Sequence, residues 1–135
     1  TNLAERFQPA AGRWEPLPTA GIDRTMTTGL VASGRWYVCG GKDNGGATDV
    51  CEVFDPEKQA WAQAPSLNTP RYGVVGASLA GSLYICGGTV DGEENGNLAS
   101  LERFDPRTCA GGVGRWETLA AMPVPRFAAQ ATAYH

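Results

Sequence analysis

Hydrophobic residues in this chain form short runs that glycine, proline and polar residues interrupt every few positions. Small apolar residues dominate positions 28–33, 73–79 and 128–134, whereas positions 36–39 and 83–86 are aromatic or apolar and end at Gly-Gly pairs. Runs of this length, bounded by turn residues, are typical of buried strands. The pattern therefore predicts an all-β chain of short strands.

One stretch of the chain recurs. Residues 35–41 return 47 residues later as 82–88, with the tyrosine, the cysteine and both glycines in register. A second stretch, in which Glu-x-Phe is followed by proline and later by tryptophan, occurs three times. Self-similarity at a period of this size indicates a repeat architecture built from one supersecondary unit. The positions that match are Glu5, Glu52 and Glu102; Phe7, Phe54 and Phe104; Pro9, Pro56 and Pro106; and Trp14, Trp61 and Trp116.

Each repeat unit is expected to be a meander of four short strands. The first strand is small and apolar, the second is aromatic and ends at Gly-Gly, the third carries Glu-x-Phe and the fourth carries the tryptophan. Evenly spaced short strands with one glycine and aromatic set per unit are typical of a β-propeller blade. We expect eleven strands, divided into the end of one blade (1–17), a second blade (25–64), a third blade (72–118) and the first strand of the next (127–135).

These residues together resemble the kelch motif. The resemblance includes the Gly-Gly pair, the tyrosine three residues before it, Glu-x-Phe-Asp-Pro, the following tryptophan and the Pro-Arg before the first strand. Gln8 and the pair Ile22-Asp23 depart from the motif, and both departures fall in predicted loops. The resemblance implies a fragment of a kelch propeller with about 2.75 four-stranded blades. Kelch propellers usually close with more blades, so we expect either a longer parent chain, consistent with a start at Thr1, or self-association that closes the ring.

The resemblance also implies a function in protein recognition. It suggests the substrate-recognition kelch domain of a cullin-3 ubiquitin ligase adaptor, which carries BTB and BACK domains and works in the cytoplasm. Two alternatives remain open at this point. One is a kelch-fold enzyme, either metal-dependent or a sugar epimerase, and the other is a cytoskeletal scaffold. We expect a binding module without catalytic activity.

Candidate partner-binding residues lie in the loops of the expected blades. In kelch adaptors the arginine that starts the first strand lines the central pocket and can hold carboxylates by bidentate hydrogen bonds; the alternative is a scaffold arginine that satisfies loop carbonyls. Loops 42–49 and 89–98 differ in length and sequence on a repeated frame, and such loops often carry recognition. The ligand would be a protein or peptide, and an acidic one would suit the arginines. The candidates are Arg24, Arg71, Arg126, Tyr72, Phe127, Lys42, Asp43, Asn44, Asp91, Glu93 and Glu94.

Composition and charge narrow the remaining functions. A net charge of -3 without a basic stripe argues against nucleic-acid binding, and the chain lacks the long apolar run of a membrane helix. His135 is the only histidine, so we expect no metal site, no catalytic residues and no cofactor. Residues 91–102 approach the spacing of a calcium loop, but Glu102 is a repeat position and a solvated acidic loop is favoured. Cys39 and Cys86 also occupy repeat positions, which favours reduced thiols in a cytosolic setting.

Overall fold

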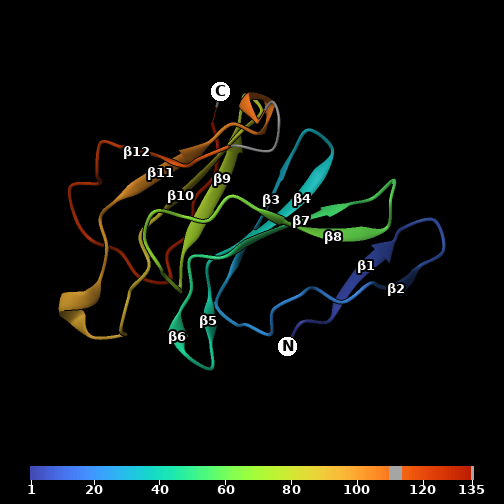
Figure 1. The fold of residues 1–135 in the computed structure, drawn as a ribbon, viewed down its shortest axis with the longest axis horizontal. Helices are drawn as coiled ribbons and strands as arrows, with labels where there is room; N and C mark the ends of the chain where they lie inside the picture. Colours follow the sequence, from blue (N-terminus) through green and yellow to red (C-terminus); the bar gives the residue numbers. More distant parts are fainter. Residues whose placement is uncertain (110–113, 135) are drawn as a thin grey trace.

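The computed structural model describes residues 1–109 and 114–134 and consists of β-strands with two single 3₁₀ turns (Figure 1). No helix in this part of the chain is long and apolar enough to span a membrane. The strands are β1 (Ala4–Gln8), β2 (Arg13–Leu17), β3 (Thr28–Ala32), β4 (Arg35–Cys39), β5 (Lys42–Asp43), β6 (Gly46–Ala47), β7 (Cys51–Asp55), β8 (Ala60–Ala64), β9 (Val75–Leu79), β10 (Ser82–Cys86), β11 (Leu101–Phe104) and β12 (Glu117–Leu119); the 3₁₀ turns are η1 (Glu94–Gly96) and η2 (Pro106–Thr108).

The strands form antiparallel meanders of the kind that the repeats predict. β3, β4, β7 and β8 make one four-stranded sheet, which we call blade 2, and β9 to β12 make another, blade 3. β1 and β2 form a two-stranded sheet, blade 1, and β5 and β6 form a small hairpin. The predicted all-β class and partial propeller are confirmed.

Two segments differ from the expected strand pattern. The β5–β6 hairpin lies within a predicted loop, where the Asp43 side chain accepts a hydrogen bond from the Gly45 amide at 2.7 Å and turns the chain. Residues 120–134 carry no strand, although a first strand of a further blade was expected at 127–135, of which His135 lies outside the described residues. A strand needs a partner strand, and none of the described strands pairs with this segment.

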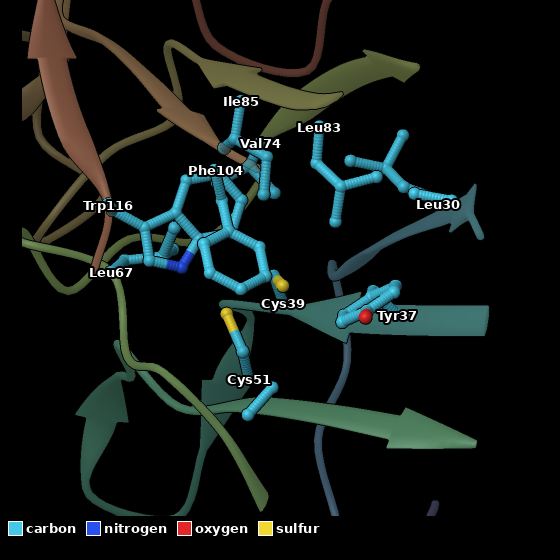
Figure 2. Close-up of a cluster of buried hydrophobic side chains, with 12 residues drawn as sticks. Leu30, Tyr37, Cys39, Cys51, Leu67, Val74, Leu83, Ile85, Phe104 and Trp116 are labelled. Carbon is cyan, nitrogen blue, oxygen red and sulfur yellow. The ribbon is translucent and has the colours of Figure 1, made fainter. Parts of the chain in front are cut away.

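The largest core lies between blades 2 and 3. Figure 2 shows Tyr37 and Cys39 of β4 facing Leu83 and Ile85 of β10, with the Phe104 and Trp116 rings closing the cluster. Tyr37 and Phe104 meet edge to face at 6.0 Å. The second strand of blade 2 therefore covers the second strand of blade 3. Neighbouring side chains along a strand point to opposite faces, so alternate residues of each strand form this contact.

The glycine pairs are required where neighbouring blades approach each other. A Cβ at Gly40 would lie 2.7 Å from the Arg71 carbonyl oxygen, and a Cβ at Gly87 would lie 2.5 Å from that of Arg126. Both glycines also have positive φ angles, which residues with a side chain rarely adopt. The repeated Gly-Gly pair thus has a packing role between blades.

The repeated tryptophans also join successive blades. Trp61 Nε1 donates to the Pro18 carbonyl at 2.7 Å, and Trp116 Nε1 donates to the Pro65 carbonyl at 2.9 Å. Trp14, at the matching position of blade 1, is 65% exposed. Blades 1, 2 and 3 therefore follow one another with the same contact, and the outer face of blade 1 is open in the described structure.

Candidate functional site

The candidate site is the end of the blades where the longer loops gather, which we call the loop face. It consists of the loops that connect one blade to the next (18–27, 65–74 and 120–127) and the loops between second and third strands (40–50 and 87–100). The two kinds of loop are joined by short backbone bridges from Thr25 to Lys42 and from Tyr72 to Thr89. The opposite end of the blades carries short turns at residues 9–12, 33–34, 56–59 and 80–81, together with the 3₁₀ turn η2 after β11.

Arg24 lies beneath the loop face and is held within blade 2. Its Nη2 donates to Glu52 Oε2 at 2.6 Å, and its Nη1 donates to the Val50 carbonyl at 2.6 Å. Glu52 Oε1 in turn accepts from the Gly21 amide at 2.6 Å, in the loop that arrives from blade 1. The pair therefore fixes the start of blade 2 and its junction with blade 1.

Arg71 repeats this arrangement in blade 3. Its Nη2 donates to Glu102 Oε1 at 2.7 Å, its Nη1 donates to the Gly87 carbonyl at 3.0 Å, and Glu102 Oε2 accepts from the Asn68 amide at 2.7 Å. Burial lowers the pKa of the Arg71 guanidinium, and the Glu102 carboxylate opposes this shift. Because the Arg71 and Glu102 side chains are 0% and 1% exposed, a partner cannot reach this ion pair in the structure.

These two ion pairs correspond to the alternative in which the repeat arginines are part of the scaffold. In addition to loop carbonyls, each arginine binds a glutamate carboxylate. The sequence identified the repeat glutamates but did not assign them as the partners of the arginines. The signal that could have found the pairs is their joint recurrence, since Arg24 precedes Glu52 and Arg71 precedes Glu102 at similar spacing. Buried charges need such partners, because an unpaired charge is costly to remove from water.

Arg126 differs from the other two arginines because it is exposed. Its backbone takes the repeat position, with the Gly88 amide donating to its carbonyl at 2.8 Å. No carboxylate in the described ranges forms an ion pair with its guanidinium group. Among the described residues, Arg126 is thus the repeat arginine whose side chain is exposed at the loop face.

Tyr72 is the point where three loops meet. The Lys42 ammonium lies 5.2 Å from the centre of its ring, and the Phe127 ring meets it edge to face at 6.0 Å. Its hydroxyl packs against Gly92, which lies in the loop between β10 and β11. Tyr72 is itself buried, whereas Lys42 and Phe127 are exposed, so the tyrosine supports the surface and its two neighbours form it.

The aspartates of the two loops bind their own backbone. Asp43 accepts from the Gly45 amide at 2.7 Å and Asp91 accepts from the Glu93 amide at 2.9 Å. Side-chain bonds of this kind shape turns. Asn44, Glu93 and Glu94 are exposed at the tips of these loops. The loop face therefore carries an acidic tip at residues 91–94 and basic groups at Lys42 and Arg126.

The described residues do not form a metal site. They contain no group of three or more histidine, cysteine, aspartate or glutamate side chains that could hold an ion. Glu102, the last residue of the calcium-like spacing, is directed to Arg71 inside blade 3. His135 lies outside the described residues. The four cysteines are free thiols, and burial raises the pKa of Cys39 well above its usual value.

Comparison with known proteins places this arrangement in a family. The family model of the kelch motif matches residues 24–68 and 70–123. The solved structure of YjhT is similar in fold, with a TM-score of 0.70 at 18% identity over 90% of this chain and 45% of YjhT. The chain thus spans about half the length of that structure, and a sequence comparison with curated proteins found no match. Because the motif matches cover most of the sequence, the chain belongs to the kelch-repeat family.

Proposed function

We propose that this chain is a protein-recognition module that binds its partner on the loop face and does not catalyse a reaction. The observation that carries the proposal is the convergence of three loops on Tyr72, above ion pairs that hold blades 2 and 3 in place. A rigid frame that presents loops of different sequence is a common basis for recognition. Aromatic and arginine side chains contribute strongly to such interfaces.

The charges on this surface suggest the chemistry of the partner. Lys42 and Arg126 are exposed cations, and Phe127 offers an aromatic surface between the loops. An acidic peptide with an apolar residue would match these groups, because a carboxylate can form charge-assisted hydrogen bonds to arginine. The acidic tip at Asp91, Glu93 and Glu94 would repel such a peptide and so would orient it, or would meet a basic side chain of the partner.

A peptide array tests the proposal. Purified chain is incubated with arrayed acidic peptides, and matched peptides in which Asn and Gln replace Asp and Glu serve as controls. The variants Arg126→Glu and Lys42→Glu should each weaken binding to selected peptides by about tenfold or more, which corresponds to about 1.4 kcal/mol. Lys58→Glu makes the same charge change at an exposed turn on the opposite end of blade 2 and should leave binding unchanged. Equal effects of all three substitutions would show a general charge effect and refute the site.

The biological setting that the family suggests is a finer proposal. We propose that the loop face selects substrates for a cullin-3 ubiquitin ligase in the cytoplasm. Kelch domains serve as interaction modules, and the resemblance to adaptors of this type supports the proposal. Co-precipitation of cullin-3 with the whole protein that contains this chain is the expected result. Co-precipitation of actin instead, with no cullin, would favour the cytoskeletal alternative.

Self-association is a further proposal, supported by the open outer face of blade 1. Phe7 and Trp14 are 48% and 65% exposed, whereas Phe104 and Trp116 at the matching positions of blade 3 are 2% and 3% exposed. Covering these rings with a second copy would bury apolar surface. Light scattering should then show a dimer that Trp14→Ala dissociates, whereas a monomer at all concentrations would contradict the proposal.

A further inference from the structure

Cys39 and Cys51 lie directly opposite each other in blade 2. They form the last residue pair between β4 and β7 before the loop of residues 40–50. The Gly40 amide donates to the Val50 carbonyl at 3.0 Å, so the two cysteines, one position earlier, form a pair without backbone hydrogen bonds between them. In such a pair the Cα atoms lie about 4.5 Å apart and both side chains point to the same face of the sheet.

The two thiols also meet in the core between blades 2 and 3. Both residues are 0% exposed, and Figure 2 shows their sulfur atoms within one cluster of buried side chains. Burial, followed by a side-chain hydrogen bond with Cys51, raises the pKa of Cys39. A disulfide joins Cα atoms that are about 4.4–6.8 Å apart and brings the sulfur atoms to about 2 Å. The pair therefore has the backbone spacing that a disulfide requires.

The second cysteine of the pair is specific to blade 2. Cys39 recurs in blade 3 as Cys86, but the residue opposite Cys86 is Leu101. In blade 1 the position that matches Cys51 is occupied by Ala4. An ordinary apolar residue is thus sufficient for packing at this position of a blade, and packing alone does not explain a second sulfur atom in blade 2.

We propose that Cys39 and Cys51 are a redox-sensitive pair that oxidation joins by a disulfide across β4 and β7. The oxidant is a small-molecule disulfide. The thiolate of one cysteine attacks it, which releases one small thiol and forms a mixed disulfide; the other cysteine then attacks the mixed disulfide and releases the second small thiol. Two electrons and the two thiol protons pass from the pair to the small thiols. Because both cysteines are buried, this exchange takes place while the chain folds or opens.

The disulfide would close the base of the loop of residues 40–50. This loop contains the β5–β6 hairpin and the exposed Lys42 of the loop face. A covalent link between the two ends of a segment restricts its open states. Oxidation should therefore slow the local opening of this loop. The corresponding loop of blade 3, residues 87–100, lies between Cys86 and Leu101 and cannot be closed in this way.

Equilibration with glutathione tests the proposal on a variant that keeps only this pair, Cys86→Ser combined with Cys109→Ser. The chain is refolded from urea in buffers with set ratios of reduced to oxidised glutathione, then quenched in acid, alkylated and analysed by mass spectrometry. A parallel series remains in urea. The disulfide should be at least about tenfold more favoured in the folded series, which corresponds to about 1.4 kcal/mol. An equal or weaker preference in the folded series would overturn the proposal.

The original chain provides a second measurement, which decides if the double variant does not fold. After refolding with oxidised glutathione, peptide mapping should find Cys39 linked to Cys51, with Cys86 and Cys109 present as thiols or as glutathione adducts. Linkage of Cys39 mainly to another cysteine would refute the pair. Glutathione adducts on Cys39 and Cys51 without a bond between them would refute it as well.

Hydrogen–deuterium exchange measures the effect on the loop. Backbone amides of residues 40–50 should exchange at least about threefold more slowly in the oxidised chain than in the reduced chain, whereas those of residues 87–100 should change by less than about twofold. Unchanged exchange in residues 40–50 would show that the bond does not fix the loop. Equal slowing in both loops would show a general stabilisation of the chain and would contradict the proposed local effect.

Discussion

Replacing Glu102 with alanine should be among the most destabilising single changes in this chain. The substitution removes a carboxylate that accepts from Arg71 Nη2 and from the Asn68 amide, both at 2.7 Å. It leaves the Arg71 guanidinium charged, 0% exposed and without its counter-ion. It also leaves the Asn68 amide without its acceptor at the junction of blades 2 and 3.

The size of the effect follows from burial. Removing one partner of a buried ion pair costs about 3–5 kcal/mol, because the other charge remains uncompensated in the interior. This is a large share of the 5–15 kcal/mol that stabilises a typical domain. Glu102→Gln keeps an oxygen acceptor and removes only the charge, so its cost should lie between those of the original residue and alanine.

Urea unfolding followed by tryptophan fluorescence measures these costs, since Trp116 is buried at the same junction. The matched control is Glu117→Ala, which breaks the Arg103–Glu117 pair at the surface, where the two side chains are 42% and 56% exposed. Exposed pairs contribute about 0–1 kcal/mol. If Glu102→Ala and Glu117→Ala lower the free energy of unfolding equally, the buried ion pairs do not hold the blades together.

Three further predictions concern other parts of the fold. Gly40→Ala should be more destabilising than Gly12→Ala by about 1–3 kcal/mol, because both glycines have positive φ but only a Cβ at Gly40 would meet another blade; equal midpoints in urea would contradict this. The Arg107 side chain lowers the pKa of Asp105 from 3.8 to about 2, so this contact stabilises the fold at pH values above 3.8 and is lost as the pH falls toward 2. Carbon NMR of the Asp105 carboxyl should show a titration midpoint near the lowered pKa. Asp105→Asn should reduce the loss of stability between about pH 4 and pH 2. Cys39 should resist alkylation at pH 7 until the chain unfolds, because burial raises its pKa; mass spectrometry of native and denatured samples would detect early labelling if this is wrong.

The strands were predictable because each one repeats in the sequence. Gly-Gly ends the second strand of both complete blades, and Glu-x-Phe marks each third strand. Ten of the eleven expected strands correspond to observed strands in the described residues. The exceptions are local. The β5–β6 hairpin occurs once and depends on the Asp43 turn, and the segment after Phe127 has no partner strand beside it.

The candidate site was only partly predictable. The sequence singled out the arginines and the variable loops, but it did not assign Glu52 and Glu102 as the partners of Arg24 and Arg71. Each glutamate follows its arginine by about thirty residues and meets it only in the folded blade. The burial of Tyr72 likewise results from contacts with Lys42 and Phe127, which come from separate loops.

Hydrogen–deuterium exchange of the chain, with and without a bound array peptide, tests whether the loop face is the recognition surface. Peptide binding should slow the exchange of backbone amides in residues 40–50, 87–100 and 124–127. The turns at 33–34 and 56–59, on the opposite end of blade 2, should exchange at an unchanged rate and serve as internal controls. Protection confined to those turns, with no change in the loop face, would contradict the claim.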